Sequence, residues 1–399
     1  MEKEIQKQID VIQRGTVEII EEPGLKMKIE NSLKDGKPLR IKYGIDPTSP
    51  EIHLGHTVVI KKLKDFQDLG HKILFLLGDF TARIGDPTGR NETRPILSEE
   101  EIKNNLQTYK QQISRILDIE KTEFVHNSDW LKNVSLENFI KIASVFTVAR
   151  LLEREDFSAR YKSGKPIFLQ EFFYPLLQGY DSVVLNADIE IGATEQKFNL
   201  LAGRSLQEFF DQEKQVVITM PILVGTDGKL KMSKTYKNHI PVNTTSEDMF
   251  GKIMSIPDDI MEHYWALLTK IPVKEFKEII ETNPRDGKFF LAKTIVSEFF
   301  GEREGEEAGL EFDRIFRNRE NPTDIPEIKI AKSALKDGRI RIVSVLVSGF
   351  NYSNSDAKRL ITQKAVKIDG KLVEDFNEYV PDGKIIKYGK GKFAKIKII

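Results

Sequence analysis

The fold of this chain is decided by the stretch Ile41-Lys-Tyr-Gly-Ile-Asp-Pro-Thr-Ser-Pro-Glu-Ile-His-Leu-Gly-His56. A run of β-forming residues, Leu39 to Tyr43, leads into a Pro-rich loop, and a helix is expected to begin near Gly55. His53 and His56 then lie one helical turn apart at the start of that helix. A helix N-terminus attracts anions through its free N–H groups, and Gly55 lets a ligand approach the backbone. The stretch predicts a nucleotide or phosphate site lined by two imidazoles.

Two other interpretations of the histidine pair remain open at this point. The same spacing occurs in metal sites, although zinc usually takes further Cys or His ligands or a carboxylate. This chain has no Cys and six His, and the remaining four His are scattered. The pair would otherwise be two ordinary surface or core residues. We expect no metal ion held by protein ligands alone.

A second motif, Lys231-Met-Ser-Lys-Thr235, follows the turn-forming sequence Gly225-Thr-Asp-Gly228. Two lysines three positions apart on a loop rich in Ser and Thr can grip a polyphosphate. The alternative is an exposed basic turn without a ligand.

The order of elements predicts an α/β fold. The apolar run from His71 to Gly78 is typical of a parallel strand buried on both faces, and with the preceding strand and helix it forms a right-handed βαβ unit. Further strands are expected at Thr122 to His126, Ala187 to Ile191 and Val216 to Met220. The loop Gly85-Asp-Pro-Thr-Gly-Arg90 lies near the carboxyl end of a buried strand, where open α/β sheets bind ligands.

One expected helix carries polar groups among large apolar side chains. Tyr174, Gln178 and Asp181 are spaced to lie on a single helical face. Such a stripe is usually the solvent face of a helix, but the surrounding residues are so apolar that a lined pocket is at least as good an interpretation.

The C-terminal part differs in charge and pattern. Helices are expected from about Ser246 to Arg319, and the Pro-containing segment 321–326 is a linker. From Ala331 to Ile399 there are 15 Lys and Arg against 7 Asp and Glu, whereas the first 330 residues hold 46 and 54. A capped helix at Ser353 to Ile361 and a hairpin around Asp369-Gly370 are expected there. A basic module on an acidic body suggests a nucleic-acid partner.

Composition bounds the class of protein. A length of 399 residues, 40% of them hydrophobic and 31% charged, predicts a globular chain of two or three domains. The absence of Cys fits a reducing compartment, and we expect a cytoplasmic protein. No apolar run reaches about 18 residues, and the first residues are charged, so we expect neither a membrane span nor a signal peptide.

The two motifs, in this order, resemble the His-x-Gly-His and Lys-Met-Ser-Lys-Ser motifs of class I aminoacyl-tRNA synthetases, with Thr235 in place of Ser. Within that class the chain resembles the bacterial tyrosyl enzymes over nearly its whole length. Three features distinguish the tyrosyl enzymes within the class: the Gly85–Arg90 loop, the face formed by Tyr174, Gln178 and Asp181, and a tail similar to an S4-type RNA-binding module.

The resemblance implies a domain organisation. It comprises a Rossmann-like parallel-sheet catalytic domain at 1–240 with a helical insertion at about 125–180, an α-helical domain at 241–326 and a small α+β S4-like domain at 331–399. It also implies the activation of L-tyrosine by ATP with Mg²⁺, transfer of tyrosine to tRNA(Tyr), and a homodimer formed through the insertion.

The resemblance also implies roles for individual residues. Catalysis would involve Thr48, His53, His56, Arg90, Arg94, Lys231, Lys234 and Thr235. ATP would contact Asp46, Pro47, His53, Leu54, Gly55, His56, Gly192, Glu195, Leu223, Val224 and the loop residues Lys231, Met232, Ser233 and Lys234. Tyrosine would contact Lys42, Gly44, Asp86, Tyr174, Gln178, Asp181 and Gln196. RNA would contact Arg339, Lys358, Arg359 and Lys364.

Three positions depart from the family pattern. Lys42 stands where many tyrosyl enzymes have a Tyr beside the phenol, and Tyr43 stands where some have Cys. The sequence Gly192-Ala-Thr-Glu-Gln196 replaces Gly-Gly-x-Asp-Gln. Three rivals stay open: a tryptophanyl enzyme, which would lack the tail, a small-molecule nucleotidylyltransferase, which has no need of it, and a non-catalytic RNA-binding descendant, which would have lost the motifs.

Overall fold

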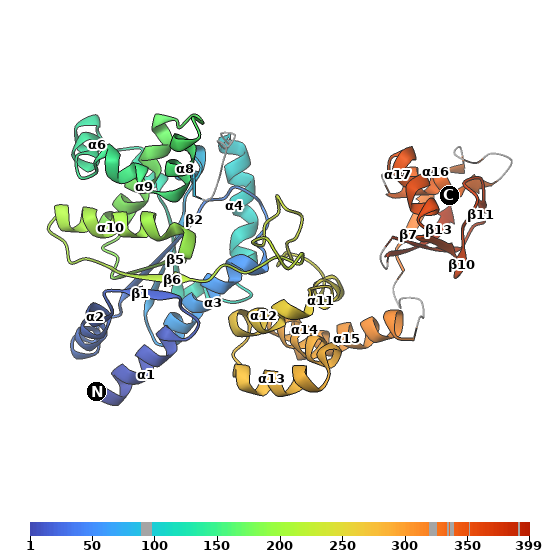
Figure 1. Cartoon of the computed structure of the whole chain (residues 1–399), viewed down its shortest axis with the longest axis horizontal. Helices are drawn as coiled ribbons and strands as arrows, with labels where there is room; N and C mark the ends of the chain where they lie inside the picture. The colour runs from blue at the N-terminus through green and yellow to red at the C-terminus, as the bar shows by residue number, and fades with distance from the viewer. Residues whose placement is uncertain (89–97, 319–324, 333–334, 336–338, 351, 390–391) are drawn as a thin grey trace. The chain divides into compact units, whose positions relative to one another are not determined.

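The computed structural model describes residues 1–88, 98–318, 325–332, 335, 339–350, 352–389 and 392–399. Its packing divides the chain into two compact units, Met1–Gly305 and Glu306–Ile399 (Figure 1). Within the described residues, no helix is both long and apolar enough to cross a membrane.

The first unit is built on a six-stranded sheet. Its strands are β1 (Glu18–Ile20), β2 (Arg40–Ile45), β3 (Lys72–Leu77), β4 (Thr122–His126), β5 (Ile189–Ala193) and β6 (Val216–Met220). The longer helices of this part are α1 (Glu2–Gln13), α2 (Glu22–Asp35), α3 (Leu54–Asp68), α4 (Glu99–Ile113), α9 (Leu169–Val184) and α10 (Lys197–Phe209). Four short helices precede α9: α5 (Ser128–Leu131), α6 (Leu136–Ala143), α7 (Val148–Leu152) and α8 (Glu155–Lys162).

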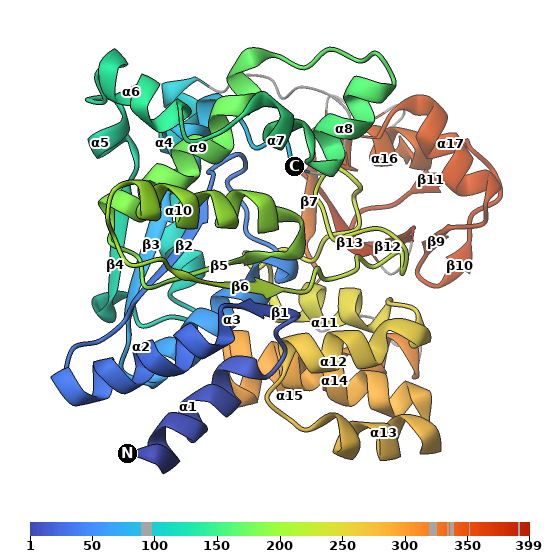
Figure 2. The same ribbon diagram turned by 60° about the vertical axis from the view of Figure 1, so that its left-hand side comes forward.

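The strand order is β1-β6-β5-β2-β3-β4, and all pairs are parallel except β1 with β6. From β2 the chain moves outward to β3, whereas from β5 it moves the opposite way to β6. Because both crossovers are right-handed, α3 and α10 must cover opposite faces of the sheet, as Figure 2 shows. The point of reversal therefore lies between β2 and β5, where open α/β sheets bind ligands.

The predicted parallel α/β fold is confirmed, and one strand was missed. Two helices were expected over the first 35 residues, and the structure places β1 between them. This strand has three residues and pairs antiparallel at the sheet edge, which is too short for an alternating pattern to show in the sequence. The strand expected at 187–191 begins two residues later, as β5.

A helical part completes the first unit. It contains α11 (Ser246–Met254), α12 (Met261–Leu268), α13 (Val273–Thr282) and α14 (Pro284–Phe300), and α15 (Glu302–Phe316) follows. The Trp265 ring is fully buried and stacks on Phe276 with centroids 3.9 Å apart. This aromatic pair joins α12 to α13.

The second unit carries a small mixed sheet in the order β10-β9-β12-β13-β7 and a separate pair, β11 with β8. The strands are β7 (Glu327–Ile330), β8 (Ile340–Arg341), β9 (Val366–Ile368), β10 (Lys371–Leu372), β11 (Tyr379–Val380), β12 (Ile385–Tyr388) and β13 (Lys392–Ile398). The helices α16 (Ile342–Phe350) and α17 (Asn354–Thr362) share one apolar core with them.

Two local predictions for this unit are confirmed. Ser353 caps α17 by accepting a hydrogen bond from the Asp356 N–H at 3.1 Å. Asp369 and Gly370 both adopt positive φ, at 46° and 81°, in the turn between β9 and β10. Positive φ at both central residues is what a tight hairpin turn of this kind requires.

Candidate active site

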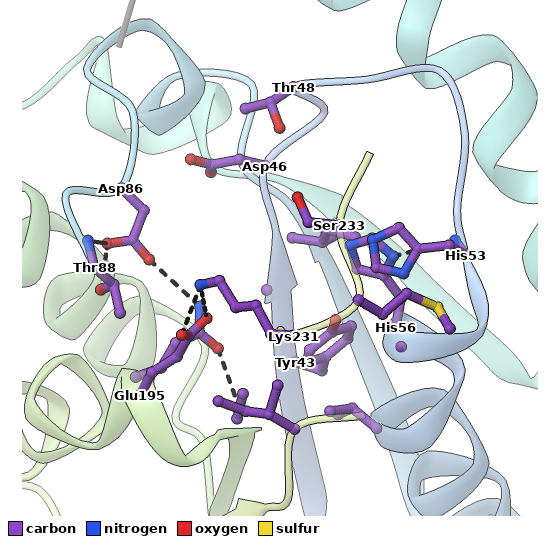
Figure 3. A pocket seen from close by; sticks show the side chains of 18 of the residues that line it. Tyr43, Asp46, Thr48, His53, His56, Asp86, Thr88, Glu195, Lys231 and Ser233 are labelled. Atoms are coloured by element: carbon purple, nitrogen blue, oxygen red, sulfur yellow. Dashed lines mark hydrogen bonds and ion pairs between the residues drawn. The ribbon is translucent and has the colours of Figure 1, made fainter. Parts of the chain in front are cut away.

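A cavity of about 770 Å³ opens at the carboxyl ends of β2 and β5, beside the start of α3. Figure 3 shows His53 and His56 on one side and Asp86 and Thr88 on the other, with Lys231 reaching across toward Glu195. The two motifs, far apart in sequence, therefore meet in one cavity because the strands that precede them, β2 and β6, flank β5 and run parallel to it, so that all three end at the same edge of the sheet.

The two histidines are fixed against each other at the start of α3. His53 is the N-cap residue, and its backbone N–H donates to His56 Nδ1 at 3.2 Å. The two rings lie 3.9 Å apart between centroids. Gly55 lies between them, and a Cβ there would meet the His53 ring at 3.0 Å. Only glycine therefore fits beside the His53 ring without displacing it.

Both lysines of the 231–235 loop are held by carboxylates. Lys231 Nζ lies 2.8 Å from Glu195, and Lys234 Nζ lies 3.1 Å from Glu51. An isolated antiparallel bridge between Val224 and Lys231 anchors the start of the loop. The loop thus brings two positive charges to the cavity mouth, each with a counterion supplied by the protein.

The polar stripe on α9 faces the cavity and not solvent. Tyr174 Oη donates to Asp46 Oδ2 at 3.0 Å, and Thr81 Oγ1 donates to Asp46 Oδ1 at 2.8 Å. At the far end Asp181 is buried and accepts two hydrogen bonds, from Trp130 Nε1 at 2.9 Å and Asn127 Nδ2 at 3.3 Å. A buried carboxyl group with a fixed orientation is thereby part of the cavity lining.

A second set of polar side chains, Asp86 and Gln178, also lines the cavity. The Oδ1 atom of Asp86 accepts hydrogen bonds from the backbone N–H and the hydroxyl of Thr88, at 2.9 and 2.6 Å. Its Oδ2 lies 3.5 Å from Gln196 Nε2. The other member is Gln178, whose Oε1 accepts from Asn199 Nδ2 at 3.1 Å. Asp86 and Gln178 thus both line the cavity with their side chains held by hydrogen bonds.

Lys42 forms a buried ion pair beneath these groups. Its side chain has 0% exposure, and its Nζ lies 2.9 Å from Glu190 Oε1. The same ammonium donates to the Gln178 carbonyl and to Ser182 Oγ, both at 2.7 Å. Lys42 contributes to the cavity floor, but its charge is directed at β5 and α9.

The family model "tRNA synthetases class I (W and Y)" matches residues 34–317. This span is more than half of the chain and contains every residue that lines the cavity. The chain belongs to this family.

Two relatives show how far the similarity of this class I synthetase extends. The tyrosine–tRNA ligase of Carboxydothermus hydrogenoformans is 51% identical over 403 residues, covering 98% of both chains. The tyrosine–tRNA ligase of Thermotoga maritima is 46% identical over 400 residues, covering 98% of this chain and 97% of its own. The likeness therefore includes the C-terminal unit as well as the sheet.

Solved structures agree on the fold. A tyrosyl-tRNA synthetase from Archaeoglobus fulgidus, complexed with L-tyrosine, superposes with a TM-score of 0.62 at 24% identity, over 76% of this chain and 99% of that one. A C-terminally truncated mitochondrial tyrosyl-tRNA synthetase from Aspergillus nidulans gives 0.64 at 20% identity, over 79% and 100%.

Burial decides the charges in the site of this synthetase. It lowers the pKa of His56 to about 4 and holds the pKa of His53 well below its usual range. Both imidazoles are therefore neutral at pH 7 and act as hydrogen-bonding groups. The histidines therefore supply no positive charge for a phosphate, whereas Lys231 brings an ammonium to the cavity lining.

Most residues predicted for tyrosine and ATP line the cavity: Lys42, Gly44, Asp46, Thr48, His53, Gly55, His56, Asp86, Tyr174, Gln178, Asp181, Glu195, Gln196, Leu223, Lys231, Met232, Ser233 and Thr235. Pro47, Leu54, Gly192, Val224 and Lys234 are not among its lining residues. Arg90 and Arg94 lie outside the described residues. Arg339, Lys358, Arg359 and Lys364 are exposed on the second unit.

Three residues that hold the site escaped the sequence analysis. Thr81 orients Asp46, while Asn127 and Trp130 orient Asp181. Each lies dozens of residues from the carboxylate it supports. Spacing along the chain carries no signal for such contacts, because the fold alone brings them together.

Asp181 gives this arrangement a measurable pH dependence. Burial raises its pKa to about 7, so the side chain holds a proton below that pH and is a carboxylate above it. Because Trp130 donates to Asp181, the fluorescence difference between the ligand-free protein and its Trp130→Phe variant should change with a midpoint near pH 7. Asp181→Asn should abolish the transition, and a transition that persists in that variant would assign it to another group.

Proposed function

We propose that this class I synthetase is a tyrosine–tRNA ligase, which forms tyrosyl-adenylate and pyrophosphate from L-tyrosine and ATP and then transfers tyrosine to tRNA(Tyr). One observation carries the proposal. A cavity lined by the His53 and His56 pair and the Lys231–Thr235 loop ends in the buried, oriented carboxyl of Asp181. The near-full-length similarity to tyrosine–tRNA ligases supports it.

Tyrosine recognition follows from the two ends of the cavity. The phenol would donate to Asp181, and a phenylalanine would leave that buried group without its partner, which is costly. The α-ammonium would lie among Asp86, Tyr174 Oη and Gln178 Oε1, with Gln196 beside them. Gly44 leaves room for the side chain against β2, and Lys42 supports the floor from below.

ATP would occupy the mouth of the cavity. Asp46, Pro47 and Thr48 follow β2, and His53, Leu54, Gly55 and His56 form the helix start that faces the phosphates. Adenine would contact Leu223 and Val224, and ribose would contact Gly192 and Glu195. Mg²⁺ would accompany ATP through phosphate oxygens and water, since it favours oxygen ligands. Among the described residues no cluster of three His, Cys, Asp or Glu is arranged to hold a metal ion.

The first step needs charge stabilisation and not a base. The tyrosine carboxylate is already a nucleophile, and it attacks the α-phosphorus of ATP while the bond to the pyrophosphate oxygen breaks. Negative charge grows on the phosphoryl oxygens and the leaving group. Neutral His53 and His56 with Thr48 can hydrogen-bond these oxygens, and Lys231, Lys234 and Thr235 supply the cationic clamp. Arg90 and Arg94 are assigned to the same clamp by the family resemblance.

The second unit would bind tRNA. Its S4-like order of helices and strands and its excess of Lys and Arg suit a phosphate backbone, and Arg339, Lys358, Arg359 and Lys364 are exposed for contact. We place the protein in the cytoplasm, a reducing compartment that suits a chain without Cys.

The function is tested by amino-acid-dependent exchange between ATP and pyrophosphate with each of the twenty amino acids. Tyrosine alone should support exchange. Lys231→Ala and Lys234→Ala should each slow it by about 10²-fold, with tyrosine affinity unchanged, because the clamp contacts only the polyphosphate. Exchange with tryptophan would move the proposal to the rival substrate, and unaltered exchange in both variants would remove the clamp assignment.

The role of the second unit is tested by the triple substitution of Lys358, Arg359 and Lys364 with Ala. The KM for tRNA should rise, and its dependence on salt should weaken, because each phosphate contact releases a counterion. Tyrosine-dependent exchange, which needs no tRNA, serves as the internal control. An equal loss of exchange and charging would show that these residues support the structure instead.

We also propose a homodimer formed through the helical insertion. Leu136 and Ile140 lie one turn apart on α6 with 74% and 59% of their surface exposed, and Val148, Phe168 and Leu169 are exposed nearby in sequence. Exposed apolar groups of this density mark an interface. Sedimentation velocity should give a dimer for the protein and a monomer for the Leu136→Lys, Ile140→Lys variant. Leu310→Lys, at an equally exposed leucine on α15, should stay dimeric; dissociation of both variants alike would contradict the assignment.

A further inference from the structure

Arg154 is a buried cation outside the cavity lining, at the start of α8. Its Nε and Nη2 form a fork with the Asp156 carboxylate at 3.0 and 2.8 Å. The guanidinium carbon lies 4.7 Å from the centre of the Phe157 ring and 5.7 Å from that of Phe198. A planar group held by a carboxylate and two rings has one orientation, so its remaining N–H groups have fixed directions.

One chain of hydrogen bonds runs from Arg154 through Asn199 to Gln178. Arg154 Nη1 donates to Asn199 Oδ1 at 2.9 Å, and Asn199 Nδ2 donates to Gln178 Oε1 at 3.1 Å. Gln178 Nε2 in turn donates to Glu190 Oε1 at 3.2 Å. A guanidinium can only donate and a carboxylate can only accept, so the two amides between them have one permitted orientation. Gln178 therefore keeps its oxygen, and not its NH₂, on the Asn199 side.

A second chain of hydrogen bonds runs from Arg154 through Thr88 to Asp86. Arg154 Nη2 donates to Thr88 Oγ1 at 3.1 Å. Because the guanidinium cannot accept, the Thr88 hydroxyl must direct its own proton elsewhere, and Asp86 Oδ1 lies 2.6 Å away. With the Thr88 N–H added, Asp86 Oδ1 is fully engaged. The carboxylate is thereby fixed with Oδ2 toward the cavity.

We propose that Arg154 is a positioning residue for amino-acid recognition, acting through Asn199 and Thr88 to present oxygen atoms of Gln178 and Asp86 to the substrate α-ammonium. This inference rests on the proposed function, which assigns the ammonium to these two residues. Without the guanidinium, the Asn199 amide can turn over and release Gln178, whose NH₂ would then repel a cation. Thr88 would lose the hydrogen bond from Arg154, so its hydroxyl would no longer be held in the orientation that donates to Asp86.

The test compares ligands that differ at the ammonium. Tyrosine and tyramine carry it, whereas 3-(4-hydroxyphenyl)propanoate keeps the phenol and the carboxylate without it. Arg154→Met should weaken binding of tyrosine and tyramine by about 10- to 100-fold, the usual range for lost hydrogen bonds to a charged group. Binding of the propanoate should stay unchanged. The fluorescence of Trp130, which contacts Asp181, reports binding without ATP.

Matched variants separate positioning from folding. Thr88→Val removes only the hydroxyl branch and should reproduce part of the loss for the two ammonium ligands alone. Arg150→Met changes an arginine in α7 that is exposed and paired with Glu153, and it should bind all three ligands like the unaltered protein. In exchange assays Arg154→Met should raise the KM for tyrosine and leave the KM for ATP unchanged.

The outcomes distinguish the inference from the function on which it rests. An equal loss of all three ligands in Arg154→Met, or no loss of any, overturns the positioning role even when the unaltered protein binds and activates tyrosine. Should Arg154→Met fail to fold, Thr88→Val decides by the same comparison of ligands. Failure of the unaltered protein to bind tyrosine overturns the proposed function, and the inference with it.

Discussion

The ion pair between Lys42 and Glu190 is the constraint on which the site depends. The two residues are register partners across the β2 and β5 pair, where the two halves of the sheet meet. The Lys42 ammonium also holds the Gln178 carbonyl and Ser182, so it fastens α9 to the sheet. Breaking one half of a buried pair costs about 3–5 kcal/mol, since the other charge is left without a partner. The floor of the cavity is therefore rigid.

Rigidity beneath α9 explains how the helix can carry groups with different tasks. Tyr174 contacts Asp46 after β2, and Asp181 is oriented by Asn127 and Trp130 beyond β4. These contacts tie α9 to the carboxyl ends of several strands. In the proposed function, the neutral histidines would act at the mouth of the cavity by hydrogen bonding and the loop lysines by their charge.

Sequence reasoning predicted the parallel sheet, the meeting of the two motifs and the pocket-facing side of α9, because each follows from local sequence pattern or from family motifs. It did not reach β1, whose three residues are fixed only by pairing with β6. It placed Lys42 with the substrate, but the ammonium is turned toward Glu190, and nothing in the local sequence names that partner. Sequence reasoning also missed Arg154 and Asn199, because their role depends on hydrogen bonds between residues that are far apart in the chain.

The carboxylates beside the two loop lysines have a consequence for selectivity among anions. Glu195 and Glu51 pair with Lys231 and Lys234, so the charges of these two lysines are offset by protein carboxylates. A polyanion that offers only a few scattered charges, such as a stretch of RNA backbone, must displace these carboxylates and gains little. A triphosphate concentrates enough charge to do so. With tRNA bound at the basic C-terminal unit as proposed, the cavity of the empty synthetase would compete little for the same phosphates.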